Sequence, residues 1–404
     1  MRLKELFELR NGYTPSKAVA EFWDGGTIPW FRMEDIRTNG RILSDSIQHI
    51  TPEAVKTAGL FDANSFIMAT TATIGEHAWL IADSLANQRF TNLKVRKSLI
   101  KRVALKYIFY LLFPIGESCK KNCRITTFPA VDMNEFKNYS FSLPPLAEQE
   151  AIAAYLDKEC EKIGREIELL ERKADSYRRL RRAIINQAVT RGLNPNVPMK
   201  PSGLRWVPNI PEHWNVGRVR NYFNFRNEKV SEIDSPPLSV TKNGVVPQME
   251  NVAKSMAEGD TRKKVCKNDF VVNSRSDRKG SCGTSPLDGS VSLIYIVLEP
   301  THIDPAFANY YFRCNDWIEE FYRNGKGIVA DLWTTNYSAM RNIEIAVPEI
   351  SEQNEIAAYL DDKCGKIDAI VEKIETKIER LKQLKRSLIN EVVTGQRAIN
   401  TSLS

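Results

Sequence analysis

Residues 274–280 form the segment whose residue types best fit contact with a charged ligand. The segment reads Ser-Arg-Ser-Asp-Arg-Lys-Gly and follows a predicted strand, Phe270–Asn273. Arginine can hold guanine through two hydrogen bonds, and serine adds polar contacts to base edges. Lysine and arginine neutralise phosphates. The segment therefore predicts a nucleic-acid contact made by Arg275, Arg278 and Lys279, with a solvated surface loop as the competing interpretation.

Other basic residues extend this prediction to both halves of the chain. The second half adds Arg262, Lys263, Lys264 and Lys326. The equivalent loop of the first half, residues 70–75, reads Thr-Thr-Ala-Thr-Ile-Gly and is neutral, so basic side chains elsewhere are better candidates for DNA contacts there. These candidates are Arg32, Arg37, Arg41 and Arg89. For each of them a solvated surface charge is the alternative.

The sequence contains no motif for chemistry on a substrate. It has no G-x-x-x-x-G-K-[ST] phosphate loop, no G-x-S-x-G nucleophile motif and no D/N-P-P-Y/F tetrapeptide of the amino-methyltransferase kind. Cys119 and Cys123 form a C-x3-C pair, but no second pair has zinc spacing, and there are only four histidines. We therefore expect no catalytic residue, no metal and no cofactor bound by this chain.

Composition and charge set broad limits on the kind of protein. With 57 lysines and arginines against 50 acidic residues, the formal net charge is +7 and the pI is about 8.9, which is compatible with DNA as a partner but does not establish it. The seven scattered cysteines fit a reducing compartment. The first residues lack a signal-peptide run, and the most apolar segment, Tyr107–Ile115, is too short to cross a membrane. We expect a cytoplasmic protein without membrane contact.

Two long stretches that nearly repeat each other are expected to position the basic residues. Residues 148–190 and 352–394 align without a gap at a shift of 204 positions, and roughly 20 of the 43 positions are identical. Apolar residues recur in both at steps of three and four, which is the seam of a coiled coil. Prolines before and a glycine after each stretch are typical start and stop signals of helices. About 45 residues at ~1.5 Å per residue predict helices of roughly 65 Å.

The chain supplies each helix with a partner of equal length and pattern. The simplest packing pairs the two helices antiparallel, which would relate the copies by an approximate two-fold axis and place the preceding domains at opposite ends. In the alternatives, each helix packs on its own globular domain, or the chain dimerises in trans. The seam positions expected at the helix–helix contact are Ile163, Ile167, Leu170, Tyr177 and Leu180 in the first helix and Ile367, Val371, Ile374, Leu381 and Leu384 in the second.

A dense basic run lies on the first helix. Residues 178–182 read Arg-Arg-Leu-Arg-Arg, and Lys382, Lys385 and Arg386 match this run in the second helix. Such a run can contact phosphates or an acidic partner surface, and a solvated helix face is the alternative.

The helices divide the chain into domains. We predict a first globular domain at 1–146, a central long helix at 147–192, a linker at 193–204, a second globular domain at 205–347, a C-terminal long helix at 348–395 and a tail at 396–404. The second domain repeats the first in outline, since Ser65–Met68 matches Asp269–Val272, while the loops between matched segments differ. The predicted fold class is α+β: two α/β globular domains separated by two long helices that form an antiparallel coiled coil with approximate two-fold symmetry.

Apolar alternation and turn residues predict the elements of the first domain. The predicted elements are strands at Thr27–Trp30, Phe66–Ala69, His77–Ile81, Thr91–Val95 and Tyr139–Leu143 and a helix at Ala104–Phe113.

Two copies of one scaffold with different loops, carried on rigid helices, suit the reading of two different short targets a fixed distance apart.

The order of globule, E-Q-x-x-I-A-x-Y-L-D helix, linker, globule and second such helix resembles the specificity subunit of type I restriction-modification enzymes. The resemblance covers essentially the whole chain. It is carried by P-P-L-A-E-Q at residues 144–149 and P-E-I-S-E-Q at residues 348–353. The segment R-W-V-P-x-I-P-x-H-W at 205–214, and W-D-G-G-T-I-P-W at 23–30 followed by Asp35-Ile36, add to it.

The resemblance implies a division of labour between this chain and partner subunits. Each globular domain would be a target recognition domain for one half of a split, asymmetric site in double-stranded DNA. The helices would set the gap between the halves and dock two methyltransferase subunits, and two motor-nuclease subunits would complete the restriction complex. Methylation of adenine N6 would use S-adenosylmethionine on the methyltransferase subunit, and cleavage would use ATP and Mg²⁺ on the motor subunit.

Two other functions stay open from the residues alone. A non-enzymatic coiled-coil scaffold whose globular domains bind protein would share the architecture but would lack DNA binding that weakens steeply with salt. An enzyme with its own active site would carry out methyl transfer or cleavage without a partner.

Overall fold

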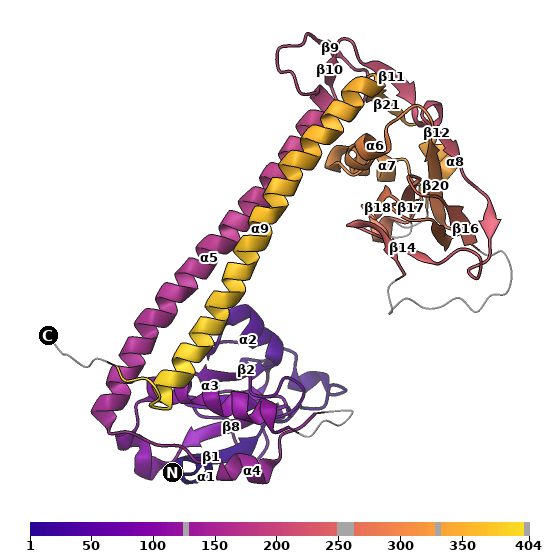
Figure 1. The fold of residues 1–404 in the computed structure, drawn as a ribbon. Coiled ribbons are helices and arrows are strands. Elements are labelled where there is room, and N and C mark those ends of the chain that lie inside the picture. Colours follow the sequence, from indigo (N-terminus) through magenta and orange to yellow (C-terminus); the bar gives the residue numbers. More distant parts are fainter. Residues whose placement is uncertain (124–128, 249–261, 328–332, 400–404) are drawn as a thin grey trace. The chain divides into compact units, whose positions relative to one another are not determined.

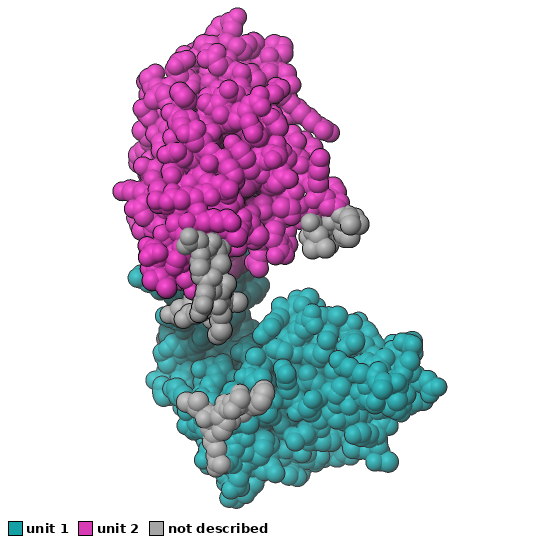
Figure 2. Space-filling model, turned by 90° about the vertical axis from the view of Figure 1, so that its right-hand side faces the viewer, with its two compact units in different colours: residues 1–169, 376–404 teal, residues 170–375 magenta. Residues whose placement is uncertain are grey.

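The computed structural model describes residues 1–123, 129–248, 262–327 and 333–399 of the 404-residue chain. The chain forms two compact units (Figure 2): unit 1 comprises residues 1–169 and 376–404, and unit 2 comprises residues 170–375. Because both boundaries fall inside long helices, each unit contains one globular domain together with a segment of both long helices.

The globular domain of unit 1 mixes short strands with helices (Figure 1). Its strands are β1 (Phe7–Asn11), β2 (Ile28–Phe31), β3 (Ile42–Leu43), β4 (His49–Ile50), β5 (Ser65–Ala69), β6 (His77–Leu80), β7 (Leu85–Ala86) and β8 (Phe90–Val95). Its α-helices are α1 (Leu3–Leu6), α2 (Met33–Asn39), α3 (Leu105–Lys121) and α4 (Met133–Asn138).

A five-stranded sheet with the order β1-β8-β5-β6-β3 is the centre of this domain, and a smaller sheet has the order β4-β2-β7. All five side chains of β5 are buried. Because side chains alternate between the faces of a strand, Phe66 and Met68 pack with α1 and α3 on one face. Ile67 and Ala69 pack with β2 and α2 on the other. Burial on both faces fixes where β5 ends, and therefore where its following loop begins.

The globular domain of unit 2 is also a mixture of short strands and helices, and its described residues form more strands than those of unit 1. The strands are β9 (Met199–Pro201), β10 (Asn209–Pro211), β11 (Asn215–Arg218), β12 (Phe223–Phe225), β13 (Lys229–Val230), β14 (Leu238–Thr241), β15 (Gly244–Pro247), β16 (Arg262–Val265), β17 (Phe270–Asn273), β18 (Cys282–Thr284), β19 (Gly289–Ser292), β20 (Tyr295–Pro300) and β21 (Glu344–Val347). The α-helices are α6 (Pro305–Tyr311), α7 (Asn315–Arg323) and α8 (Tyr337–Met340).

The strand β17 occupies the place in unit 2 that β5 has in unit 1. It lies inside a four-stranded sheet of order β12-β20-β17-β18, and all its side chains are buried. Phe270 and Val272 pack with α6 and α7, while Val271 packs against β14, β15, β16 and β19 on the other face. Phe66 and Phe270 differ by the 204 positions that relate the two repeats, so the sequence match of these strands is also a match of burial.

The long helices are α5 (Leu146–Arg191) and α9 (Ile350–Val393), which lie side by side and antiparallel within each unit (Figure 1). In unit 2, Arg181 Nε lies 3.0 Å from Asp368 Oδ1. In unit 1, Lys377 Nζ lies 2.7 Å from Glu166 Oε1. The predicted pairing of the helices within one chain is therefore present. The approximate two-fold relation between the copies concerns the arrangement of the units and stays a prediction.

Each long helix also packs on the globular domain that precedes it, so its apolar stripe serves both the helix pair and the domain. The first turns of α5 bury Ile152, Leu156 and Cys160 in the core of unit 1, where the last turns of α9 join them with Leu388 and Val392. In unit 2 the roles are exchanged, with Ile356, Leu360 and Cys364 of α9 beside Ile185, Ala188 and Val189 of α5.

The predicted seam positions differ in burial. Ile163, Ile367 and Ile374 are buried, and Leu180 and Leu384 are 47% and 52% exposed. The remaining seam positions are half-buried: Ile167, Leu170, Tyr177, Val371 and Leu381.

The E-Q-x-x-I-A-x-Y-L-D motif proves to be the joint between domain and helix. The fully buried Gln149 accepts a hydrogen bond from Ala104 N (2.9 Å) and donates to Pro144 O (2.8 Å) and Arg102 O (3.0 Å). Its repeat Gln353 accepts from Asp304 N (2.8 Å) and donates to Pro348 O (2.9 Å). Both buried glutamines thereby have hydrogen-bond partners in the backbone around the start of the helix.

A tyrosine of each domain reaches the aspartate that closes the motif. The hydroxyl of Tyr110 donates to Asp157 Oδ1 at 2.8 Å, and the hydroxyl of Tyr310 donates to Asp361 Oδ1 at 2.7 Å. Burial is the main cause that raises the pKa of both tyrosines, so both stay donors at neutral pH. The repeated motif therefore specifies how each helix leaves its domain.

The sequence predictions for the first domain hold with one exception. Four of the expected strands correspond to β2, β5, β6 and β8, and the expected helix is α3, which continues through Pro114 to Lys121. The strand predicted at Tyr139–Leu143 is wrong: Ser140 makes only an isolated bridge to Arg2. The physical reason is that α1 begins at Leu3, so no strand is available to pair. The matching segment of unit 2, β21, pairs with β11.

Candidate nucleic-acid interface

The loops that follow β5 and β17 are held by the same backbone hydrogen bonds. In unit 2, Thr335 N donates to Ser274 O at 2.9 Å and Ser276 N donates to Trp333 O at 2.9 Å. In unit 1, Val131 N donates to Thr70 O at 2.9 Å and Ala72 N donates to Pro129 O at 3.2 Å. Every residue in one set lies 204 positions from its counterpart in the other. The two loops therefore share one backbone frame.

The second segment of the frame, residues 129–132 or 333–336, leads directly into a short capped helix in both units. Asp132 accepts hydrogen bonds from Asn134 N and Glu135 N at the start of α4. Asn336, its equivalent, accepts from Ala339 N at the start of α8. Side-chain oxygens at this position satisfy the free N–H groups of a helix start. Each unit thus presents two adjacent loops, residues 70–75 with 129–132 and residues 274–279 with 333–336, which we call reading surfaces 1 and 2.

Reading surface 2 carries the predicted basic residues. Arg275 forms a two-pronged ion pair with Asp277, with Nε–Oδ1 at 2.9 Å and Nη2–Oδ2 at 3.1 Å. The Arg278 side chain is 69% exposed, and Lys279 Nζ lies 2.6 Å from Glu319 Oε2. Lys326 pairs through its backbone with Thr334 of the same surface. The structure therefore brings Arg275, Arg278, Lys279 and Lys326 together.

The remaining basic candidates of unit 2 lie on β16 and have structural partners. Arg262 donates from Nε to Ser290 Oγ (2.8 Å), and Lys263 donates from Nζ to Tyr295 O (2.7 Å). Burial lowers the pKa of Lys263. Lys264 Nζ pairs with Glu228 at 3.0 Å, and this hydrogen bond raises its pKa. These contacts stabilise the domain and leave Arg262 and Lys263 little capacity for a ligand.

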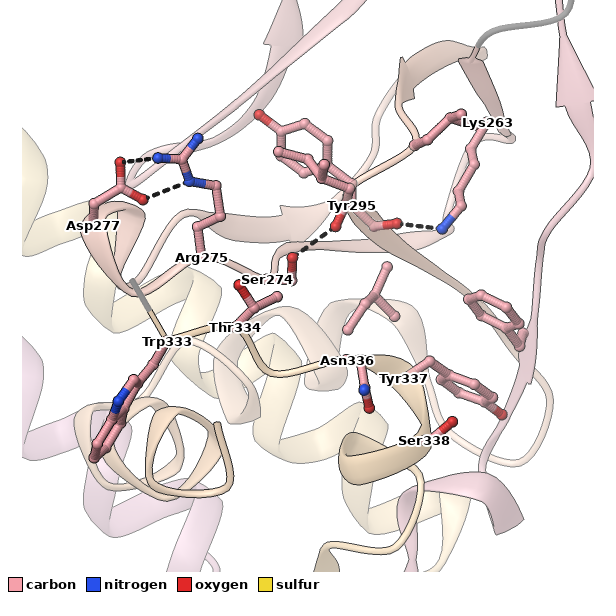
Figure 3. A pocket seen from close by; sticks show the side chains of 14 residues that line it. Lys263, Ser274, Arg275, Asp277, Tyr295, Trp333, Thr334, Asn336, Tyr337 and Ser338 are labelled. Atoms are coloured by element: carbon pink, nitrogen blue, oxygen red, sulfur yellow. Dashed lines mark hydrogen bonds and ion pairs between the residues drawn. The ribbon is translucent and has the colours of Figure 1, made fainter. Parts of the chain in front are cut away.

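A cavity of about 640 Å³ opens beside reading surface 2 (Figure 3). Phe225 stacks on Tyr337 with ring centroids 4.1 Å apart, and Tyr295 and Trp333 also line the cavity. Arg275 with Asp277 and Asn336 with Ser338 supply polar groups around it. Sequence reasoning missed Trp333 and Tyr337. The 204-residue shift does not point to them either, because residues 129–133 of the first repeat carry no basic or aromatic side chain.

Reading surface 1 has a neutral loop, and basic side chains come to it from other elements. Arg37 and Arg41 line a cavity of about 650 Å³ together with Ala72 and Thr73 of the loop. Arg89 is exposed, and its carbonyl accepts from Thr70 N at the start of the loop. Arg32 precedes α2 and pairs with Glu34 at 3.1 Å. Lys120, which sequence reasoning also missed, lines the same cavity from α3.

Among the described residues there is no group of three or more histidine, cysteine or acidic side chains that could hold a metal ion. Burial raises the pKa of the thiols of Cys282 and Cys314 to about 12, which keeps both protonated and unreactive. None of the described helices has the length and apolar character needed to cross a bilayer.

Comparisons with known proteins were consistent in the kind of protein they found. A family model described as a type I restriction modification DNA specificity domain matches residues 1–172. The specificity subunit of type I restriction enzyme EcoprrI from Escherichia coli is 48% identical over 163 residues, which is 39% of this chain and 41% of that protein. The EcoR124I/EcoR124II specificity subunit from Escherichia coli is 30% identical over 192 residues, 44% of this chain and 46% of that protein. The matched part thus spans less than half the length of these curated relatives.

A solved structure extends the similarity to the whole fold. It comes from work on complex assembly and conformational transition of the type I R-M system, and covers 98% of this chain and 97% of its own with a TM-score of 0.70. At 16% sequence identity this similarity concerns the fold alone.

Proposed function

We propose that the chain is the DNA specificity subunit of a type I restriction-modification complex, because residues 1–172 match the family model of type I restriction modification DNA specificity domains. Each globular domain, 1–146 and 205–347, reads one half of a split, asymmetric site in double-stranded DNA. The chain itself performs no chemistry and acts in the cytoplasm.

The observation that carries this proposal is the pair of reading surfaces. Both are held by the same backbone hydrogen bonds, yet Thr71 stands where Arg275 stands and Pro129 where Trp333 stands. Sequence is read by side chains that reach base edges, while the surrounding scaffold only positions them. One frame with two different sets of side chains is the arrangement needed to read two different half-sites.

The long helices complete the proposal. They set the distance between half-sites and dock two methyltransferase subunits, and two motor-nuclease subunits join them in the restriction complex. S-adenosylmethionine is then bound by the methyltransferase subunits, and ATP and Mg²⁺ by the motor subunits. The DNA contacts proposed for this chain are Arg32, Arg37, Arg41 and Arg89 in unit 1 and Arg275, Arg278, Lys279 and Lys326 in unit 2.

A domain exchange tests the proposal. Residues 205–347 are replaced with the corresponding domain of a relative, and the methylated adenines of the host genome are mapped before and after. One half of the recognised site is expected to change while the other half and the spacing are kept. A change in both halves would contradict the division of labour. DNA binding that does not weaken with salt would instead favour the protein-binding scaffold.

A further inference from the structure

Each unit contains a basic cavity where its globular domain meets the last turns of the long helix from the other repeat. In unit 1 the cavity has a volume of about 420 Å³ and lies between residues of α3 and Arg386, Ser387 and Asn390 of α9. In unit 2 the cavity has a volume of about 470 Å³ and lies between residues of α6 and α7 and Arg181, Arg182 and Ile185 of α5. We call them junction cavities 1 and 2.

The two junction cavities occupy the same place in the repeat. Arg182 and Arg386 are identical residues related by the shift of 204 positions, and each lines its cavity. The end of the reading loop lines both cavities as well, with Gly75 and Glu76 in unit 1 and Lys279 and Gly280 in unit 2. Each cavity therefore begins where a reading surface ends.

Positive charge dominates both cavities. Junction cavity 1 is lined by four basic side chains (Arg41, Lys120, Lys121, Arg386) against two carboxylates (Glu76, Glu117). Junction cavity 2 is lined by five (Arg181, Arg182, Lys242, Lys279, Arg313) against one, Glu319. Burial, together with the charges of Arg41 and Lys120, lowers the pKa of His77 to about 3, so this histidine adds no charge to junction cavity 1.

Two cations in each cavity have neither a carboxylate nor a carbonyl partner among the described residues. In unit 1, Arg41 and Lys120 pair with Glu76, which leaves Arg386 and Lys121. In unit 2, Arg181 pairs with Asp368 and Lys279 with Glu319, and Arg313 donates to Lys242 O, which leaves Arg182 and Lys242. An arginine and a lysine facing a polar cavity form a binding site for an anion.

The class of ligand can be inferred from the features that the two repeats share and from those in which they differ. The side chains of the reading surfaces differ between units, as base-reading contacts to two half-sites must. The basic junction cavities are kept, as a contact to something common to both half-sites would be. In duplex DNA the common anion is the phosphodiester, and it lies next to whichever base pair is read.

We propose that junction cavities 1 and 2 each bind a backbone phosphate of the DNA beside the half-site read by the same unit, with Arg386 and Arg182 as the principal contacts. This inference rests on the proposed function and adds to it two equivalent, sequence-independent anchor points. They fix the register of each reading surface on the duplex without contributing to base preference.

The test uses the full-length chain and a fluorescent duplex of arbitrary sequence, because a phosphate contact does not depend on sequence. Binding of the duplex is titrated over a series of KCl concentrations for the wild type, for Arg182→Gln/Arg386→Gln, and for the control Arg165→Gln/Arg380→Gln. The control residues are exposed on the same helices, are not among the side chains that line either cavity, and remove the same total charge. Circular dichroism on heating establishes that both variants fold.

The wild type should lose affinity linearly in log–log form as salt rises. The slope for Arg182→Gln/Arg386→Gln should be smaller by about 0.9 for each phosphate contact removed, or roughly a tenfold smaller loss of affinity between 50 and 200 mM salt for two contacts. The control should keep the wild-type slope. Equal slopes for the two variants would overturn the junction cavities as phosphate sites.

Two further outcomes separate the inference from the function on which it rests. A wild type that does not bind duplex DNA at all would contradict the proposed function itself. If duplex binding is unchanged in Arg182→Gln/Arg386→Gln but a co-purifying protein subunit is lost, the cavities bind an acidic protein surface, and the phosphate assignment is wrong.

Discussion

Reading surfaces 1 and 2 differ in where their cations come from. In unit 2 the basic groups are in the loop itself, since Arg275, Arg278 and Lys279 follow β17 directly. In unit 1 the loop is neutral, and Arg37, Arg41 and Lys120 reach the same place from α2 and its following turn and from α3. The backbone hydrogen bonds are nevertheless the same. The comparison shows that the two units share the position and backbone of the surface but differ in the side chains that it carries.

Removing the central aromatic residue of either sheet should produce the largest difference in stability between the two units. Phe66 and Phe270 are both fully buried in β5 and β17. Truncation of such a residue leaves a cavity and costs about 3–5 kcal/mol. Phe66→Ala should therefore unfold unit 1 preferentially, and Phe270→Ala unit 2. Hydrogen exchange resolved by segment in urea measures this, and equal loss of protection in both units would mean that they unfold together.

Replacing the buried glutamine at the start of each long helix should produce a smaller difference in the free energy of unfolding. Gln149 makes three hydrogen bonds to backbone groups and Gln353 makes two. At about 1 kcal/mol for each bond, Gln149→Ala should cost roughly 3 kcal/mol and Gln353→Ala roughly 2 kcal/mol. Urea unfolding of the two variants measures the difference. The neighbouring Asn354 is exposed on the same helix, so Asn354→Ala serves as the control, and a cost for it equal to that of Gln353→Ala would remove the assigned role.

The sequence was sufficient for the parts of the fold that repeat. The 204-residue shift predicted both long helices and placed β17 by its match to β5, because burial on both faces leaves an apolar run that survives divergence. The strand expected at Tyr139–Leu143 failed because pairing depends on a partner that is distant in sequence. The role of Gln149 was not predicted for the same reason: its backbone partner Ala104 is 45 residues away.

The candidate site was only partly predictable. Clusters of basic residues located the loop after β17. Charge alone could not distinguish Arg278, which is exposed, from Lys263, whose ammonium group donates a hydrogen bond to Tyr295 O. Trp333 and Tyr337 reach the cavity from a segment some 60 positions after the loop. Only the backbone frame shows that the two segments are neighbours.

Lowering the pH should destabilise unit 1 more than unit 2, because of a single histidine. His77 is fully buried in unit 1, and its equivalent in unit 2 is Ser281. Burial lowers the pKa of His77 from 6.5 to about 3. Because the folded state disfavours the protonated ring, its contribution to stability is complete above pH 6.5 and is lost as the pH falls from there toward 3. Between pH 7 and pH 5 this amounts to about 2 kcal/mol.

Unit 1 should therefore lose protection from hydrogen exchange faster than unit 2 between pH 7 and pH 5, after correction for the intrinsic exchange rates. His77→Gln removes the titrating group, so its stability should vary less with pH even if it is lower throughout. A pH dependence that is the same in His77→Gln and the wild type would exclude His77 as the cause.

The finest test of the comparison is a change of base preference in one half-site. Arg275 is the side chain of reading surface 2 best suited to hold guanine, and Thr71 stands at the same point of surface 1. A two-pronged contact with a base is worth about 1–3 kcal/mol. We expect the low end, roughly tenfold, because the guanidinium must give up its ion pair with Asp277. Arg275→Ala should relax one position of the half-site read by unit 2, and Thr71→Ala should leave that half-site unchanged. Competition binding with duplexes altered at single positions measures both, and a uniform loss of affinity for every sequence would make Arg275 a phosphate contact instead.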